Sequence, residues 1–240
     1  VEGINEISRN KFSGQDMASR HAQWIETIGE WKREQPLTYA KGDKYLKPQH
    51  VVRVLNEITG GNAIITTEVG QNQMWAAQFY DFDKPRTLIT SGGLGTMGYG
   101  FPAAIGAQVA FPNKLVIDIA GDGSIQMNIQ EMATAVQNKL PVKIVILNNT
   151  YLGMVRQWQE LFYKHNYSST SMTGQPDFVK LAEAYGAEGY RIMTEEELAP
   201  TLKKALASPN TAIIDVVVEP EEDVYPMVPA GASLDEMLLV

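Results

Sequence analysis

Apolar and polar positions alternate along this chain in two rhythms, one typical of helices and the other of buried strands. Between residues 15 and 35, Trp24, Ile28 and Trp31 recur at helical spacing, and Pro36 ends the run. From Pro48 onward, short apolar runs alternate with longer helical runs. The expected strands are 63–67, 87–90, 115–120, 142–147, 189–192 and 212–218. The expected helices between and around them are 48–59, 72–80, 99–110, 125–139, 152–163, 177–185 and 195–207.

This alternation predicts an α/β fold with a doubly wound, mostly parallel sheet and helices on both faces. We expect residues 41–240 to form this domain, and residues 1–40 to end a preceding domain and its linker. The stretch Lys41-Gly42-Asp43-Lys44 has the charge of a linker. The tail from Glu219 contains three prolines and is expected to wrap over the surface. The chain starts at Val1, so we expect it to be a fragment or a processed product.

The composition limits the partners and the metal ligands that the chain can have. The net charge of −8 over 240 residues disfavours nucleic-acid and anionic-membrane partners. The absence of cysteine excludes disulfides and thiolate metal sites, and three scattered histidines make zinc an unfavourable choice. No apolar run reaches the length of a membrane span, and no signal-peptide pattern opens the chain. A metal site here must therefore use oxygen ligands.

Two of the expected strands end in oxygen-bearing side chains. Gly121-Asp122-Gly123-Ser124 follows strand 115–120, and Asn148-Asn149 follows strand 142–147. Ligands of doubly wound sheets bind beyond the carboxyl ends of the strands, and neighbouring strands lie about 5 Å apart. Asp122, Asn149 and a carbonyl beyond Asn149 could then bind one Mg²⁺ together with diphosphate oxygens. The glycines would let the backbone approach phosphates, and Ser124 is expected to cap the next helix. Separately, each motif is typical of a turn or a strand end.

A second motif competes with this interpretation. Gly93-Leu94-Gly95-Thr96-Met97-Gly98 matches the glycine fingerprint of dinucleotide sites, and Asp118 follows it at a suitable spacing. However, Asp118 lies within its predicted strand and not at the carboxyl end. The fingerprint alone is therefore weak support for a dinucleotide site.

Several motifs occur in an order that resembles the acetohydroxyacid synthase (acetolactate synthase) family, specifically its large catalytic subunit. They are TEVGQNQMW at 67–75, SGGLGTMGYG at 91–100, GDGS at 121–124, NN at 148–149, GMVRQW at 153–158 and PMVP at 226–229. The resemblance runs from about Pro48 to the end of the chain. It implies the carboxyl-terminal domain that binds thiamine diphosphate, with residues 1–40 as the end of the central domain.

The resemblance also implies a role for individual residues. Mg²⁺ would be bound by the side chains of Asp122 and Asn149 and by the carbonyl of Tyr151. Gly95 and Met97 would hold the aminopyrimidine of the cofactor. Residues expected to contact the cofactor are Val69, Gly70, Gln71, Asn72, Gly95, Met97, Gly121, Asp122, Gly123, Ser124, Asn149, Tyr151, Leu152, Gly153 and Met154.

Met154 and Trp158 share a helix face. By resemblance they border the substrate pocket, whereas their spacing alone favours core positions. Asn72 stands where the family usually has histidine, so we expect it to donate to phosphate without carrying a charge.

By resemblance, the whole enzyme condenses pyruvate with pyruvate or 2-ketobutyrate, losing CO₂, in branched-chain amino-acid biosynthesis. It would use thiamine diphosphate and Mg²⁺, bind FAD mainly through the central domain, and work as a homodimer or higher oligomer with a regulatory small subunit. Its active site would lie at the subunit interface. We expect a cytoplasmic protein of bacterial type, with a plastid or mitochondrial origin as the alternative.

The glutamate that activates the cofactor would come from a separate amino-terminal domain, and Glu68 does not match its position. This chain alone is therefore expected to be inactive. Two alternatives stay open. One is a different thiamine-dependent decarboxylase or carboligase, such as a glyoxylate carboligase, pyruvate decarboxylase or pyruvate oxidase. The other is a non-catalytic cofactor-binding fragment.

Overall fold

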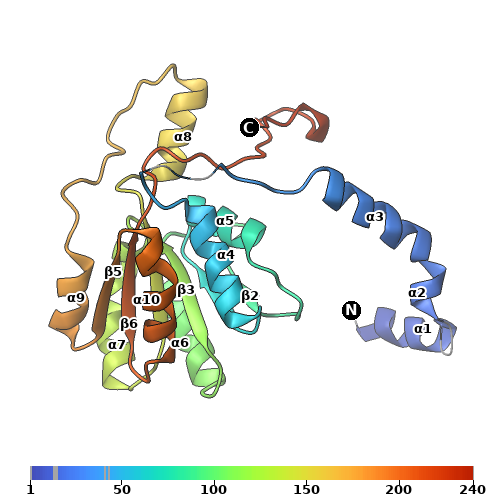
Figure 1. Ribbon diagram of the computed structural model, residues 1–240. Helices are drawn as coiled ribbons and strands as arrows, with labels where there is room; N and C mark the ends of the chain where they lie inside the picture. The colour runs from blue at the N-terminus through green and yellow to red at the C-terminus, as the bar shows by residue number, and fades with distance from the viewer. Residues whose placement is uncertain (1, 13–15, 41, 43, 240) are drawn as a thin grey trace. The chain divides into compact units, whose positions relative to one another are not determined.

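The chain divides into two compact units, Val1–Thr38 and Tyr39–Val240 (Figure 1). The structure is a computed structural model that describes residues 2–12, 16–40, 42 and 44–239. Lys41 and Asp43 of the predicted linker, and the first residue of the predicted helix 15–35, lie outside the described residues.

The first unit consists of short helices. They are α1 (Glu2–Phe12), α2 (Met17–Arg20) and α3 (Ala22–Glu34). The single helix predicted over 15–35 is wrong, because the backbone leaves helical geometry at His21, where φ is −107° and ψ is 10°. Trp24 and Trp31 meet edge to face with ring centres 5.4 Å apart, but both remain more than half exposed. Their helical spacing produces a ring pair on the surface of α3 and no buried core.

The second unit is built on one parallel sheet of six strands. Their order across the sheet is β2-β1-β3-β4-β6-β5, and every pair is parallel. This confirms the predicted α/β fold. The strands are β1 (Ile64–Thr67), β2 (Leu88–Ile89), β3 (Val116–Gly121), β4 (Lys143–Asn148), β5 (Glu188–Ile192) and β6 (Ala212–Val217).

Helices cover both faces of this sheet (Figure 1). Side chains of α4 (Pro48–Thr59), α5 (Gln71–Phe79) and α10 (Glu195–Ala207) share one hydrophobic cluster with the strands. Side chains of α6 (Gly100–Ala110), α7 (Met132–Gln137) and α9 (Phe178–Tyr185) share the other. Because each strand has apolar residues on both faces, the strands read as continuous apolar runs in the sequence.

One predicted helix is replaced by two elements. Residues 125–139 form a 3₁₀ helix, η1 (Ile125–Glu131), followed by α7, with non-helical dihedrals at Asn128. The break allows Asn128 Nδ2 to donate to the Gly98 carbonyl at 2.7 Å. The predicted cap by Ser124 is also wrong. Ser124 already has helical dihedrals, and its Oγ donates to the Gly121 carbonyl at 3.4 Å.

The helix α8 (Gly153–Phe162) follows β4 and lies close to the carboxyl edge of the sheet (Figure 1). The tail beyond Glu219 includes a bridge between Met227 and Leu238 and the short helix η2 (Leu234–Glu236). Residues of α8 hold its first part. Arg156 pairs with Asp223, and Gln157 Nε2 donates to the Val224 carbonyl at 3.0 Å.

Candidate functional site

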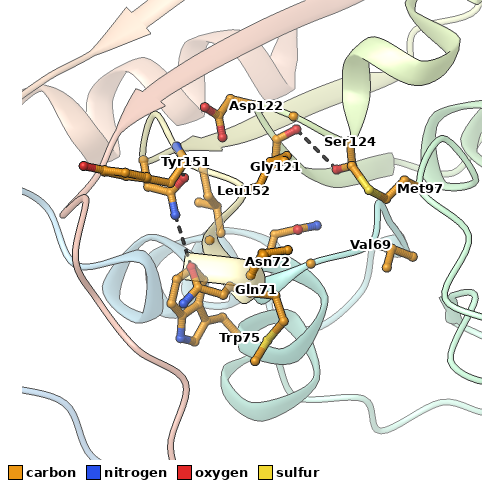
Figure 2. Close-up of a pocket in the computed structure, with 17 residues that line it drawn as sticks. Val69, Gln71, Asn72, Trp75, Met97, Gly121, Asp122, Ser124, Tyr151 and Leu152 are labelled. Atoms are coloured by element: carbon orange, nitrogen blue, oxygen red, sulfur yellow. Dashed lines mark hydrogen bonds between the residues drawn. The ribbon is translucent and has the colours of Figure 1, made fainter. Parts of the chain in front are cut away.

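A cleft of about 100 Å³ opens at the carboxyl ends of β1, β3 and β4 (Figure 2). The sheet register brings these ends together. Thr67 pairs with Ile119, and Gly121 pairs with Leu147, so that Asp122 and Asn149 follow neighbouring strands. The lining residues are Val69, Gly70, Gln71, Asn72, Trp75, Met97, Gly121, Asp122, Gly123, Ser124, Leu147, Asn149, Tyr151, Leu152, Gly153, Met154 and Val155. Every residue predicted to contact the cofactor is present, except Gly95.

Asp122 is a buried carboxylate without a complete set of partners. Its side chain is 1% exposed, and Oδ2 has no hydrogen-bond partner within the described part of the chain. Burial raises the pKa of Asp122 to about 7, and the negative Asp215 adds to this, whereas the N–H groups of Thr150 and Gly123 oppose it. A buried carboxylate oxygen without a donor is costly unless a cation neutralises it. This residue therefore fits a metal ligand.

Asn149 supplies the second oxygen. Its Oδ1 accepts from the Tyr151 N–H at 3.1 Å, and its Nδ2 donates to Gln71 Oε1 at 3.1 Å. Thr150 between them has φ of 59°, a left-handed conformation that is rare for a β-branched residue. The turn 149–151 thus brings the Tyr151 N–H to the side-chain oxygen of Asn149. Tyr151 also lines the cleft.

The ligand set is poor in negative charge. Over the ranges that the structure describes, no group of three or more His, Cys, Asp or Glu side chains could hold a metal. Asp122 is the only carboxylate among the residues that line the cleft. A divalent cation bound here would take its remaining anionic ligands from a bound molecule, which is the usual arrangement for Mg²⁺ with phosphates.

Two glycines allow this close packing. A Cβ added at Gly153 would lie 2.0 Å from Gln71 Oε1 and 2.7 Å from Asn149 Nδ2. A Cβ at Gly123 would lie 2.7 Å from Leu152 Cδ2. Side chains at these two positions would displace the groups that form the floor of the cleft. Across the cleft, the N-terminus of α5 begins at Gln71 and offers backbone N–H groups suited to an anion.

Asn72 does not have the geometry that we predicted. Its Nδ2 donates to the carbonyls of Glu68 and Ile119, each at 2.9 Å. Both amide hydrogens are thus used to join the ends of β1 and β3. A phosphate contact from Asn72 is left to its backbone N–H, because the side-chain amide has no hydrogen to spare.

The glycine fingerprint does not form a dinucleotide site. Asp118 is fully buried and accepts from Thr66 Oγ1 at 3.0 Å, so it cannot face a ribose. Gly95 is not among the residues that line the cleft, although a Cβ added there would lie 3.9 Å from Val69 Cγ1, which lines it. Glu68 is buried and accepts from the N–H groups of Gly98 at 2.6 Å and Phe101 at 3.0 Å. Glu68 therefore anchors the loop that carries Met97.

A second cavity of about 450 Å³ adjoins the cleft along α8. Met154 and Val155 line both cavities, and Trp158, Gln159, Tyr163 and Asn166 line the second. Trp158 is 39% exposed, and its ring meets Phe162 edge to face at 5.7 Å. The interpretation of Met154 and Trp158 as core residues is therefore wrong.

Three lining residues were missed by the sequence prediction, namely Trp75, Leu147 and Val155. Trp75 lies one helical turn after Gln71 on α5, a spacing that places both on one face. Leu147 ends an apolar strand, and nothing in its surroundings along the chain distinguishes it from the core.

Within the described residues, no helix is both long and apolar enough to cross a membrane.

Comparison with known proteins agrees with the motifs. The family described as "Thiamine pyrophosphate enzyme, C-terminal TPP binding domain" matches residues 68–216. The chain is 50% identical over 223 residues to the mitochondrial acetolactate synthase catalytic subunit of Saccharomyces cerevisiae, covering 90% of this chain and 32% of that protein. It is 49% identical over 219 residues to the large subunit of acetolactate synthase isozyme 3 of Escherichia coli, covering 90% and 38%.

A plant relative matches almost the whole chain. The chain is 42% identical over 245 residues to the chloroplastic acetolactate synthase 1 of Nicotiana tabacum, covering 99% of this chain and 36% of that protein. The predicted resemblance is confirmed. The chain spans about a third of the length of the curated relatives it matches.

Proposed function

This chain belongs to the family of C-terminal TPP-binding domains of thiamine pyrophosphate enzymes, and we propose that it anchors thiamine diphosphate and Mg²⁺ in an acetohydroxyacid synthase. The observation that carries the proposal is the buried Asp122 oxygen without a partner, in a cleft that Asn149 also lines. Residues 1–40 would then be the end of the central domain and its linker, which precede the cofactor-binding domain at 41–240.

Three oxygens of this chain would hold the cation. Asp122 contributes its charged carboxylate, Asn149 its Oδ1, and Tyr151 its backbone carbonyl. The orphaned Oδ2 of Asp122 supports this assignment, as does the all-oxygen character of the donor set. The cation would neutralise a carboxylate whose pKa is raised by burial, and would tie the diphosphate to the ends of β3 and β4.

The diphosphate would lie between two backbone segments. Val69 to Asn72 lead into α5, whose N-terminal N–H groups favour an anion, and the turn 121–124 follows β3. Met97, Leu152, Gly153 and Met154 would contact the organic part of the cofactor, with Gly95 supporting the loop beside Val69. When bound, thiamine diphosphate supplies a carbanion-stabilising centre for 2-ketoacid chemistry, and these residues orient it.

The second cavity is proposed as the substrate pocket. It joins the cleft through Met154 and Val155, so a 2-ketoacid held against Trp158 would sit beside the cofactor. The substrates would be pyruvate, followed by pyruvate or 2-ketobutyrate. Met154 together with Trp158 favours this synthase over other thiamine-dependent carboligases.

Activation would need a group from outside the cleft. The residues that line it include no glutamate, and Glu68 is occupied by the N–H groups of Gly98 and Phe101. An interface with a second subunit is the proposed source, in a homodimer or larger oligomer that also binds FAD and a regulatory small subunit. The yeast and tobacco relatives are named as mitochondrial and chloroplastic, so an organellar origin stands beside a cytoplasmic one.

The test is complementation. The 240-residue chain, given pyruvate, Mg²⁺, thiamine diphosphate and FAD, should form no acetolactate. Adding a polypeptide that carries the amino-terminal and central domains of an acetohydroxyacid synthase should restore acetolactate formation. A parallel assay with glyoxylate should give the lower rate. Acetolactate formation by the chain alone, or a preference for glyoxylate, would contradict the proposal.

A further inference from the structure

A chain of side-chain amides connects the tail to the cleft. It begins at Gln157 on α8, which is fully buried and lies outside the cleft. Gln157 Nε2 donates to the Val224 carbonyl at 3.0 Å, and Gln157 Oε1 accepts from the Val224 N–H at 2.9 Å. A carbonyl only accepts and an N–H only donates, so Val224 fixes which end of the Gln157 amide is oxygen.

Gln71 continues the chain of amides. Its Nε2 donates to Gln157 Oε1 at 3.0 Å and to the Glu222 carbonyl at 2.8 Å. Because a backbone carbonyl can only accept, the nitrogen end of Gln71 must face the tail. The oxygen end then faces the cleft, where it accepts from Asn149 Nδ2 at 3.1 Å (Figure 2).

The last amide in the chain is the proposed metal ligand. Gln71 holds the nitrogen end of Asn149, and the Tyr151 N–H holds the oxygen end. Turned over, Asn149 would present two N–H donors to a cation and lose its ligand oxygen. The orientation of this amide therefore matters more to metal binding than its mere presence does.

We propose that the docked tail and Gln157 are positioning elements, which orient Asn149 through Gln71 so that Oδ1 faces the Mg²⁺ site. This inference rests on the proposed function. Besides Gln71, the tail is docked by contacts that lie outside the cleft. The buried Arg156 donates to the Glu221 carbonyl at 3.0 Å and pairs with Asp223, and Lys47 pairs with Glu222. Coupling between two sites is reciprocal, so metal and cofactor binding should in turn stabilise tail docking.

The first experiment measures the affinity of the full 240-residue chain for thiamine diphosphate at a series of Mg²⁺ concentrations. Gln157→Leu should weaken the Mg²⁺-dependent binding about tenfold, the loss typical of supporting residues around a metal. Gln108→Leu is the matched control. Gln108 is also a buried glutamine, but its Nε2 donates to the carbonyls of Phe111 and Lys114 beyond α6. The control should bind like the wild type.

The second experiment separates orientation from general loosening. A carboxylate has two equivalent oxygens and so no wrong orientation. In an Asn149→Asp background, Gln157→Leu should therefore cost less than about twofold in Mg²⁺-dependent affinity, against about tenfold in the wild-type background. Equal losses in both backgrounds would overturn the inference, because a structural role would not depend on the ligand's symmetry.

Hydrogen exchange keeps the inference testable if Gln157→Leu folds poorly. Mg²⁺ with thiamine diphosphate should slow exchange of the Val224 amide in the wild type, and Gln71→Leu should remove that protection. Unchanged exchange at Val224 on binding would overturn the inference. If the wild type shows no Mg²⁺-dependent binding, the proposed function itself fails. If the wild type binds and Gln157→Leu binds equally well, only the inference fails.

Discussion

Two buried aspartates near the carboxyl edge of the sheet meet opposite surroundings. Asp215 on β6 accepts from Asn148 Nδ2 at 2.8 Å and from Arg191 Nε at 3.1 Å. Asp122, which follows β3, keeps one oxygen without a partner in the described chain. Both are about 1% exposed, so both have lost their water. The protein compensates one carboxylate with its own donors, and we propose that a cation compensates the other.

The largest expected effect on cofactor affinity comes from removing the charge of Asp122, the aspartate that has an oxygen without a protein donor. Asp122→Asn removes the only carboxylate among the residues that line the cleft. We expect Mg²⁺-dependent binding of thiamine diphosphate, measured by calorimetry, to fall by at least about 100-fold, because Mg²⁺ depends on charged oxygen ligands. Asp215→Asn is the matched control and should change affinity by less than about threefold, since Asp215 already has protein partners. Equal losses of affinity in the two variants would contradict the proposal that Asp122, and not Asp215, binds the cation.

Removing a donor from Asp215, the aspartate with protein partners, should lower the stability of the fold instead. Arg191→Leu removes the charged partner of Asp215 and leaves it the Asn148 amide, and it also removes the ion pair between Arg191 and Asp177.

 The Asp215 carboxylate would then keep an amide donor but lose its positive neighbour. We expect the free energy of unfolding in urea at pH 7 to fall by about 1–2 kcal/mol, less than a fully buried pair would cost because the Arg191 side chain is 39% exposed. Adding Asp215→Asn to Arg191→Leu should recover part of this loss. An unchanged unfolding curve for Arg191→Leu would contradict the account of Asp215.

A third aspartate sharpens the comparison, because one of its oxygens lacks a partner although the residue does not line the cleft. Asp118 on β3 accepts from Thr66 Oγ1 through one oxygen, while Oδ2 has no partner in the described chain. Burial, and then the negative charge of Glu68, raise the pKa of Asp118 well above its usual range. An unpartnered oxygen is therefore a candidate metal ligand only where a cavity gives a cation access to it.

The raised pKa of Asp118 sets the sign of a pH effect. A carboxyl whose pKa is higher in the folded state contributes its full stability below the unfolded pKa, and loses it as pH rises through the folded pKa. Asp118→Asn mimics the protonated form, so it should raise the free energy of unfolding at pH 8 by about 1–2 kcal/mol and change little near pH 4. Urea unfolding of both proteins at pH 4, 6 and 8 measures this difference. A difference that does not vary with pH would contradict the assignment.

Much of the fold and the centre of the site were predictable from local patterns. Apolar runs of strand length alternate with helical runs, and that rhythm is enough to indicate a parallel sheet. Pro48 at the first turn of α4 and the left-handed Gly60 at its end mark that helix in the sequence as in the structure. Asp122 and Asn149 were predictable as neighbours because each directly follows a strand, and the ends of parallel strands share one edge.

Contacts between distant parts of the chain were not predictable in this way. Gln71 is 86 residues from Gln157 and 151 from Glu222, and no periodic pattern links such positions. The replacement of one predicted helix by η1 and α7 depends on Asn128 reaching Gly98, which is a tertiary contact. The use of both Asn72 amide hydrogens by backbone carbonyls likewise appears only once β1 and β3 lie side by side.

The most direct test of the central claim is a calorimetric titration of thiamine diphosphate into the wild-type chain, once with Mg²⁺ and once with a metal chelator. The compensation of Asp122 by a cation predicts binding of one cofactor per chain with Mg²⁺, and at least about 100-fold weaker binding with the chelator. The same affinity under both conditions, or no binding in either, would contradict it.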